Sequence, residues 1–463
     1  MSTENITSSP VAPGTGTDDF AASRVPPDRL QSAWDISLVR MGLTVSASDL
    51  VFGYTVGLYF SFWQAIGISL LISLIVLVIS VGMGAIGLRE RLTFALSARF
   101  AFGREGSRLP SLVMTVIIAA FYGYILAVTA DVFPDAKNGA VQVLYCLGLG
   151  VLMVAVSALG FSRGLKWIGR VGVPLMVVLV IVADAVTITH DHGFSAIVHA
   201  RPALAGKISL AVILGAGIAK WTGGAAISAD VMRFARSTRA LFTSTAAEFL
   251  VGNFGFNLLG LILGLGLRSS DLGAALGLVG LTWLATVAFL VQGITVETNE
   301  LYAASLASSN ALGLSRRTSN IAVGVIGVII GYIGLSHGAT ASFLTFINYV
   351  SYALPAIPGI ILADYFVVSR MRYRTALADL AAVNWRAVTA YIAAVGLSLI
   401  TGLGLGDPVW RILPLFGFVI YIAVSIPQVA AAWRAPRTAD AAGSADDLAT
   451  AQPRVARDLP QEG

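Results

Sequence analysis

A lysine, a tryptophan and two glycines stand in the middle of a long apolar stretch and could form a binding site. Lys220 and Trp221 precede Gly223 and Gly224 in a run that is hydrophobic from about residue 208. A charged side chain at the centre of a membrane helix costs about 2.5–3.5 kcal/mol on insertion scales, so it usually marks function. Glycine weakens a helix by about 1 kcal/mol per residue, so the pair predicts a break that lines a cavity. The alternative is a helix kink with a lysine that reaches to one face.

A second polar group lies in another apolar stretch. Three of its residues recur at helical spacing and share one face: Gln292, Thr295 and Asn299. Glu297 is offset to the side of this face, and a carboxyl at this depth needs a partner or a water-filled cavity. We expect Glu297 to pair with Lys220, and a neutral carboxyl that ties helices together is the alternative. Glu300 is either part of this group or a solvated residue near the cytoplasmic end of the helix.

Aromatic residues could supply the walls of such a site. Trp221 offers one flat apolar face, and Phe121, Tyr122 and Tyr124 offer another in a separate apolar stretch. An aromatic slot binds a planar heterocycle by stacking, while nearby polar groups read its edge. Because aromatic side chains in such helices often only pack, this observation supports a planar ligand without identifying it.

The composition places these residues in a membrane protein. The 463 residues are 56% hydrophobic and 12% charged, whereas a soluble domain carries about 25% charged residues. Apolar runs of about twenty residues recur along the chain, which predicts an all-α protein that crosses a lipid bilayer repeatedly. The net charge of +5 belongs to the loops and indicates no nucleic-acid partner. The spans contain no catalytic triad or metalloprotease pattern, so we expect neither an enzyme nor a bound cofactor.

We predict twelve membrane spans between two polar tails. Residues 1–33 and 434–463 have the composition of disordered tails. Most Lys and Arg residues fall in loops on the side of the N-terminus, so the positive-inside rule places both termini in the cytoplasm. We expect the membrane to be the inner membrane of the cell. The predicted spans are residues 35–60, 62–87, 110–132, 138–160, 168–188, 208–232, 240–266, 277–306, 318–336, 341–368, 385–404 and 410–432.

Two of these spans are interrupted in the same way. The first contains small polar residues and Asp49 in mid-membrane, and the sixth contains Lys220 with its glycines. Matched interruptions five spans apart indicate an inverted repeat with the binding site between its halves. We therefore predict one repeat over residues 34–190 and a second over residues 207–368, with residues 385–433 appended.

Several motifs in the right order resemble the nucleobase–cation symporter family of cytosine and hydantoin permeases, with the cytosine permease branch most similar. The motifs are residues 96–103, 228–234, 299–303, 363–366 and 383–385. The likeness extends from about residue 35 to residue 430. It implies a twelve-helix fold of the leucine-transporter type, with a 5+5 inverted repeat, broken helices 1 and 6, and transport by alternating access.

The resemblance also implies roles for individual residues. The ligand stacks on Trp221 of helix 6 and lies against Phe121 of helix 3. Four polar residues match positions around the edge of the ligand: Ser46, Lys220, Gln292 and Glu297. Lys220 and Glu297 introduce charge where cytosine permeases are mostly neutral.

The resemblance leaves the coupling ion open between Na+ and H+. The family's sodium site uses backbone carbonyls that match Gly42, Val45 and Gln292, together with two neighbouring hydroxyls on helix 8. Only the first hydroxyl is present, at Thr295, because Val296 stands at the second position. A buried pair of a lysine and a glutamate can take up a proton in place of sodium.

These observations predict a secondary symporter that imports a planar heterocycle of the nucleobase type, such as cytosine, another pyrimidine or a purine, with H+ or Na+. We expect it to act as a monomer in the lipid bilayer. A vitamin-precursor, amino-acid or amine carrier of the same fold is the first alternative. A membrane sensor that binds without transport is the second, although the short loops and tails hold no signalling domain.

Overall fold

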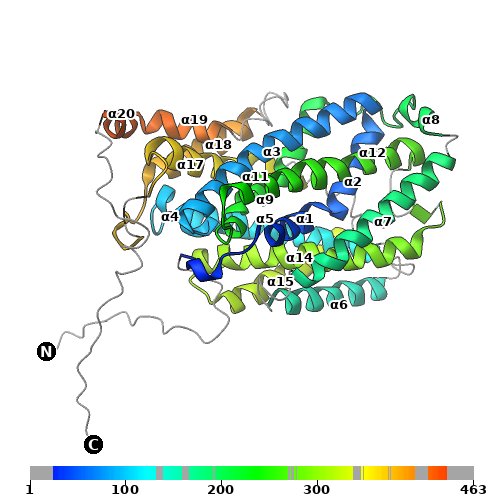
Figure 1. The fold of residues 1–463 in the computed structure, drawn as a ribbon, viewed down its shortest axis with the longest axis horizontal. Helices are drawn as coiled ribbons and strands as arrows, with labels where there is room; N and C mark the ends of the chain where they lie inside the picture. The colour runs from blue at the N-terminus through cyan, green and yellow to red at the C-terminus, as the bar shows by residue number, and fades with distance from the viewer. Residues whose placement is uncertain are drawn as a thin grey trace, which may run out of the picture.

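The structure is a computed structural model that describes residues 24–131, 139–158, 166–190, 193–269, 272, 276–277, 279–336, 346–347, 349–373, 375, 377–401 and 415–434. This part of the chain is helical apart from its loops and one isolated bridge between Gln31 and Ala235. Figure 1 shows the longer helices lying side by side along the long axis of the molecule. The predicted all-α class is confirmed for the described residues.

The helices follow one another along the chain from α1 near the N-terminus to α20 near the C-terminus. They are α1 (Ala33–Thr44), α2 (Ala47–Tyr59), α3 (Phe62–Glu90), α4 (Phe94–Phe102), α5 (Arg108–Asp131), α6 (Gly139–Ala158), α7 (Lys166–His190), α8 (Phe194–Val198), α9 (Leu210–Ala226), α10 (Ser228–Met232), α11 (Thr238–Ala246), η3 (Ala247–Asn253), α12 (Phe254–Leu267), α14 (Thr282–Leu312), α15 (Arg316–Ser336), α17 (Ala356–Ala363), η4 (Asp364–Val368), α18 (Trp385–Leu399), α19 (Leu415–Val424) and α20 (Ile426–Arg434).

Apolar helices occupy the predicted spans. Within the described residues, seven helical stretches are long and apolar enough to cross a membrane, and two bent pairs, α1 with α2 and α19 with α20, raise the number to nine. Three shorter apolar helices overlap the other predicted spans: Pro174–His190, Thr282–Val291 and Trp385–Leu399. The multi-pass helical architecture is therefore confirmed, and the count of twelve spans stays a prediction.

The first span is broken near its middle, as predicted. Helix α1 ends at Thr44, α2 begins two residues after Val45, and the two helices are bent by 48° relative to each other. Ser46 caps α2, because its hydroxyl accepts a hydrogen bond of 3.2 Å from the backbone N–H of Asp49. This cap places Asp49 in the first turn of α2, where the helix dipole favours a negative charge.

The sixth span is not broken at its glycine pair, so that part of the prediction is wrong. Gly223 and Gly224 lie inside α9, and the chain leaves the helix only at Ile227 before α10 starts. A Cβ atom on Gly224 would lie 2.7 Å from Cε3 of Trp221. Gly224 therefore leaves room for the indole ring, and helix propensity alone could not reveal this role.

Helices α2 and α12 touch through their backbones. A Cβ atom on Gly53 would lie 2.1 Å from the carbonyl oxygen of Asn257, and one on Gly260 would lie 2.2 Å from that of Leu50. Gly57 and Gly264 repeat these contacts one turn further along. Glycines spaced in this way allow membrane helices to approach closely, and in this fold they hold α2, with Asp49, against the segment that follows η3.

The segment η3 is a π-helical turn between α11 and α12. A π-helix forms hydrogen bonds between residues i and i+5, so residues five apart lie near one another on its surface. Glu248 and Asn253 are five apart, and both contact the first broken span, at Arg40 and Asp49 respectively. In a regular α-helix these two side chains would point in clearly different directions.

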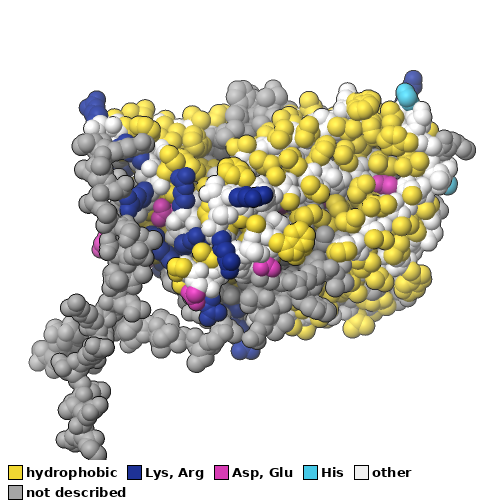
Figure 2. Space-filling view, viewed as in Figure 1, with side chains coloured by type: hydrophobic (Ala, Val, Ile, Leu, Met, Phe, Trp, Pro, Cys, Tyr) yellow, Lys and Arg dark blue, Asp and Glu magenta, His cyan; other side chains and the backbone are white. Residues whose placement is uncertain are grey.

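The loops predicted to lie in the cytoplasm meet at one end of the molecule. Arg91, which follows α3, donates a hydrogen bond of 3.0 Å to the carbonyl oxygen of Arg233 after α10. Arg370, after η4, donates one of 2.8 Å to the carbonyl oxygen of Ala432 in α20. Figure 2 shows Lys and Arg side chains concentrated toward one end of the visible face, and hydrophobic side chains over most of the rest.

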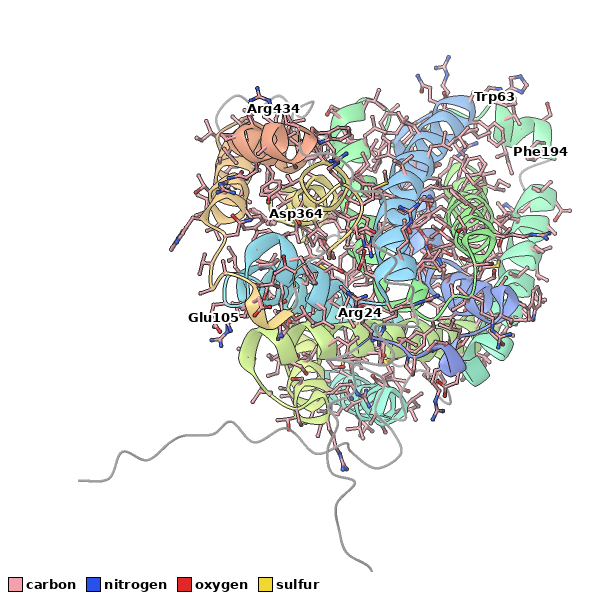
Figure 3. All side chains as sticks on the ribbon, turned by 60° about the vertical axis from the view of Figure 1, so that its left-hand side comes forward. Arg24, Trp63, Glu105, Phe194, Asp364 and Arg434 are labelled. Carbon is pink, nitrogen blue, oxygen red and sulfur yellow. The ribbon has the colours of Figure 1, made fainter. Side chains whose placement is uncertain are left out.

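Aromatic side chains mark a different part of the surface. The ring of Phe62 makes edge contacts with Trp63 at 5.3 Å and with Phe194 at 5.6 Å. Figure 3 shows Trp63 and Phe194 close together, on the opposite side of the view from Glu105 and Arg434. Tryptophan is enriched where a membrane meets water, and the Trp63 side chain is 70% exposed.

Part of the predicted N-terminal tail packs against the helices. The backbone N–H of Gln31 donates a hydrogen bond of 2.7 Å to the carbonyl oxygen of Phe234, and Val25 is buried. The ordered chain therefore begins earlier than the predicted boundary at residue 33. Residues 1–23 and 435–463, which hold the rest of the two predicted tails, lie outside the described part of the chain.

Candidate functional site

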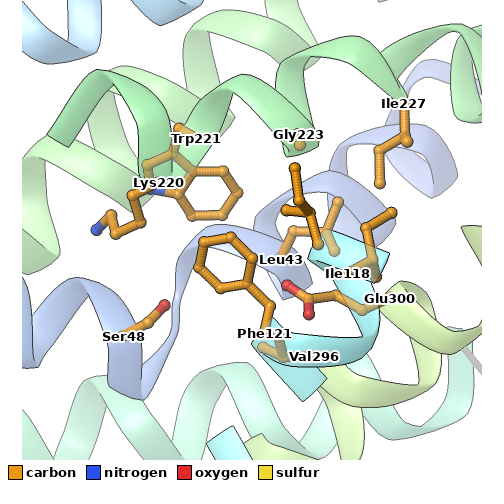
Figure 4. Close-up of a pocket in the computed structure, with 12 residues that line it drawn as sticks. Leu43, Ser48, Ile118, Phe121, Lys220, Trp221, Gly223, Ile227, Val296 and Glu300 are labelled. Carbon is orange, nitrogen blue, oxygen red and sulfur yellow. The ribbon is translucent and has the colours of Figure 1, made fainter. Parts of the chain in front are cut away.

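A buried pocket lies where α1, α2, α5, α9 and α14 meet. Trp221 enters it from α9 and Phe121 from α5 (Figure 4). The free volume among the side chains is about 30 Å³, which holds about one or two water molecules and no ring. The lining residues are Leu43, Ser48, Ile117, Ile118, Phe121, Lys220, Trp221, Gly223, Gly224, Ile227, Val296 and Glu300.

The two aromatic residues that the sequence singled out both line this pocket. Each is 7% exposed. The rings of Trp221 and Phe249 are perpendicular, with centres 5.8 Å apart, and those of Phe121 and Phe346 cross at 76° with centres 5.2 Å apart. Edge-to-face contacts of this kind fix the orientation of both aromatic walls.

Asp49 is the centre of the polar network beside the pocket. Its Oδ1 accepts hydrogen bonds from Lys220 Nζ, from Trp221 Nε1 at 2.8 Å and from Asn253 Nδ2 at 2.6 Å. Its Oδ2 accepts one of 2.8 Å from the hydroxyl of Ser46. The Asp49 side chain is fully buried, and a buried charge of this kind is stable only when paired and hydrogen-bonded.

The sequence predicts Glu297 as the partner of Lys220, and that prediction is wrong because Lys220 forms its ion pair with Asp49. The Lys220 ammonium also lies 4.7 Å from the ring centre of Phe52, a favourable cation–π distance. Figure 4 shows the stem of Lys220 beside the pocket and its ammonium directed away from Phe121 and Glu300. Lys220 therefore forms part of the pocket wall, with its charge neutralised inside the protein.

Glu300 lines the pocket, so of the two alternatives the structure selects membership of the polar group over a solvated residue near the cytoplasmic end. Figure 4 shows its carboxyl directed toward Phe121. Its Oε2 is buried and has no hydrogen-bond partner among the described residues. A buried oxygen in this condition can accept a hydrogen bond from a ligand at no cost to an internal contact.

The predicted ligand and sodium contacts of several other residues are not tested by the structure. Gln292, Thr295 and Glu297 belong to α14, and their side chains lie outside the described part of the structure, so their roles as ligand or sodium contacts stay predictions. Gly42 lies in α1, Val45 follows the end of that helix, and Val296 lines the pocket.

Ser46 is close to the site and bonded within the protein. Its hydroxyl contacts Asp49 and lies 2.8 Å from the hydroxyl of Ser48. Ser48, which sequence reasoning passed over, lines the pocket. Asn253 was also missed, and nothing in the local sequence indicates the π-helical turn that brings it to Asp49.

A second buried ion pair joins Arg40 of α1 to Glu248 of η3. The same guanidinium donates hydrogen bonds to the hydroxyl of Ser80 at 2.7 Å and to that of Ser228 at 3.2 Å. Arg40 therefore ties α1 to α3, α10 and η3. The guanidinium is enclosed by protein, since the side chain is only 1% exposed.

Comparison with protein families supports the resemblance seen in the motifs. A family described as permease for cytosine/purines, uracil, thiamine, allantoin matches residues 25–422. The cytosine permeases of Escherichia coli strain K12 and of Escherichia coli O157:H7 are 26% identical over 375 residues, which are 81% of this chain and 87% of each permease.

Comparison with solved structures supports the fold. The chain is similar to Mhp1, a nucleobase-cation-symport-1 family transporter in a closed conformation with bromovinylhydantoin bound, with a TM-score of 0.70 and 15% identity over 88% of this chain and 96% of Mhp1. It is also similar to a Na+-coupled sialic acid symporter, with a TM-score of 0.64 and 11% identity over 89% of this chain and 93% of that symporter. Because the family match covers most of its length, this chain belongs to the nucleobase–cation symporters, the family of permeases for cytosine/purines, uracil, thiamine and allantoin.

Proposed function

We propose that the protein imports a planar nitrogen heterocycle of the nucleobase type by alternating access. The observation that carries this proposal is the pocket lined by Trp221, Phe121 and Glu300, whose Oε2 has no hydrogen-bond partner among the described residues. Aromatic rings bind a flat base through its faces. A carboxylate reads the ring N–H or amino groups at the edge of the base, as in other specific pockets.

The assignment of the edge contacts differs from the one that the sequence suggested. Lys220 uses its ammonium on Asp49, and Ser46 uses its hydroxyl on the same carboxylate. Glu300 and Ser48 line the pocket and are the better candidates for contacts to the ligand. Glu297 keeps its predicted role until its side chain is tested.

Admission of a ligand requires the pocket to widen. The present free volume of about 30 Å³ is smaller than any aromatic base. The pocket is walled by α1 and α2 on either side of one helix break and by α9 next to a second interruption at Ile227. Movement at such breaks is how discontinuous helices open a midplane site in transporters.

We propose H+ as the coupling ion. Val296 stands where the family's sodium site has its second hydroxyl, and the Glu300 carboxyl in the pocket can carry a proton. Accumulation of a base in proteoliposomes under a proton gradient without sodium supports this proposal. Accumulation that requires a sodium gradient and ignores the proton gradient overturns it.

The predicted topology completes the proposal. We propose twelve spans in a 5+5 inverted repeat and a monomer in the inner membrane with both termini in the cytoplasm. The meeting of the basic loops at one end supports the orientation. Cys146 is the only cysteine, so a Cys146→Ser protein provides a background for single cysteines. Labelling from the outside should reach Lys207→Cys and spare Arg236→Cys, and the reverse pattern contradicts the orientation.

An amino-acid or amine carrier of the same fold is the main alternative. A zwitterion needs a free cation and a free anion in the pocket, and the ammonium of Lys220 is already paired with Asp49. This favours an uncharged base. Counterflow of radiolabelled cytosine, uracil, hypoxanthine and phenylalanine in proteoliposomes decides between them, and binding without counterflow indicates a sensor.

A further inference from the structure

We propose that Asp49 is a positioning residue that sets the plane in which Trp221 offers its ring to the ligand. One oxygen of this carboxylate takes the indole N–H together with the donors of Lys220 and Asn253. The inference rests on the proposed function, because it explains how the stacking wall of that site is fixed. It assigns Asp49 no contact with the ligand, and Asp49 is not among the residues that line the pocket.

The indole is held at two places and lines the pocket. Its Nε1 donates to Asp49 at 2.8 Å, and the Phe249 ring lies perpendicular to it with the ring centres 5.8 Å apart. Gly224 leaves space beside the six-membered ring. Because an indole has a single N–H donor and Asp49 accepts it, a ligand at the pocket meets the ring through its π face.

Asp49 is itself held from several directions. The Ser46 hydroxyl accepts a hydrogen bond from the backbone N–H of Asp49 and donates one to Oδ2 of Asp49. The glycine contacts between α2 and α12 fix the helix that carries Asp49. Asn253 reaches it from the π-helical turn. The carboxylate therefore forms a rigid reference point to which the Trp221 ring is attached.

Asp49 contributes both a negative charge and an acceptor oxygen, and a substitution can remove the charge while keeping the oxygen. The charge balances the ammonium of Lys220, whereas the Trp221 N–H needs only an oxygen at the right place. Replacement of Asp49 alone would leave Lys220 charged and unpaired in a buried site, which destabilises the protein for reasons unrelated to Trp221. A useful test must neutralise both residues together.

The test compares two double variants. Asp49→Asn with Lys220→Met removes both charges and keeps an acceptor oxygen for the indole. Asp49→Leu with Lys220→Met removes the charges and the acceptor. Both variants lose the Lys220 ammonium, so they are compared with each other. We expect the Leu variant to bind radiolabelled cytosine at least about tenfold more weakly than the Asn variant. Equal affinity in the two variants overturns the proposal.

A third change shows whether the effect passes through the indole. Trp221→Phe keeps an aromatic ring and removes the N–H donor. In a Trp221→Phe background the Asn and Leu variants should differ by less than about twofold, because Asp49 then has no indole to hold. A difference as large as that in the Trp221 background means that position 49 acts by another route and overturns the proposal.

A measurement without ligand separates this inference from the proposed function. The chain has 8 tryptophans, and the fluorine resonance of Trp221 in protein labelled with 5-fluorotryptophan is identified by its loss in Trp221→Phe. This resonance should keep its position in the Asn variant and shift or broaden in the Leu variant. If the unmodified protein binds none of the bases, the proposed function fails, and the fluorine spectra still decide the role of Asp49.

Discussion

A Cβ atom added to Gly224 would lie 2.7 Å from Cε3 and 2.8 Å from Cζ3 of Trp221. Such contacts are too short for carbon atoms, so the indole ring keeps its position only because residue 224 has no side chain. The neighbouring glycine is different, since a Cβ atom on Gly223 would meet its nearest neighbour, Cδ2 of Leu354, at 3.5 Å. The two glycines therefore provide a matched pair of variants.

Gly224→Ala should weaken base binding by at least about tenfold, because the new methyl group displaces the indole from its plane. Gly223 also lines the pocket, but its methyl group would not touch the indole, so Gly223→Ala should weaken binding clearly less than Gly224→Ala does and should stabilise the helix by up to about 1 kcal/mol. Binding assays with radiolabelled base and thermal unfolding in detergent measure the two effects. Equal affinities for the two variants would show that the position of the indole does not matter.

Trp221→Ala should remove the main stacking wall. Base–aromatic stacking contributes about 1–3 kcal/mol by alanine substitution, so the dissociation constant should rise by roughly 5–150-fold. Trp283→Ala is the control, because that side chain is 70% exposed on the outside of the helices. A Trp221→Ala protein that binds as tightly as the Trp283→Ala protein would place the ligand elsewhere.

Glu300→Gln should weaken binding of a base that presents N–H groups by about tenfold or more. A hydrogen bond to a charged group contributes about 1.5–3 kcal/mol, and the buried Oε2 has no other partner among the described residues to retain it. Glu297→Gln is the informative comparison, since the sequence favoured that carboxyl and the pocket favours Glu300. A larger loss in Glu297→Gln would reverse the assignment.

Arg40→Ala should destabilise the protein by about 3–5 kcal/mol, because it leaves the buried Glu248 without its partner. Thermal unfolding in detergent measures the loss. Arg236→Ala is the control, since Arg236 is exposed and donates to the carbonyl oxygen of Leu30 at 3.1 Å. Similar unfolding temperatures for both variants would mean that the Arg40 pair does not stabilise the fold.

The coupling ion can be separated from binding by a gradient experiment. With an inward proton gradient and no sodium, the protein should accumulate base above its external concentration, and a protonophore should abolish this accumulation. Counterflow should persist after the protonophore, because exchange across an equilibrated membrane needs no net driving force. Accumulation that survives the protonophore and follows a sodium gradient would identify sodium as the coupling ion.

The positions of the seven long apolar helices and the two bent pairs of the described chain could be read from the sequence, because each is an apolar run of sufficient length. The break in the first span was also readable, since Ser46 and Asp49 are a capping residue and an acid in mid-membrane. The aromatic walls followed from the resemblance at Trp221 and Phe121. These features depend on local composition or on motifs, so no knowledge of packing was needed.

The partners within the site could not be read in the same way. Glu297 and Asp49 were both available as carboxyl partners for Lys220, and only the packing of α2 against α9 and η3 selects Asp49. Glu300 lines the pocket, and the sequence does not say which of the two glutamates of this helix does so. The role of Gly224 depends on the orientation of a ring three residues earlier.

The backbone contact between α2 and α12 has a mechanical consequence. A Cβ atom added to any of the four interface glycines would lie 2.1–2.7 Å from a backbone oxygen of the facing helix. The two helices are therefore in direct backbone contact and cannot slide or roll past one another. They must travel as one rigid body whenever the protein changes shape. The short link at Val45 and Ser46 then becomes the joint between this body and α1, which can swing only when the Arg40–Glu248 ion pair separates. A proline or a crosslink placed at the joint should stop the transport cycle without touching the ligand.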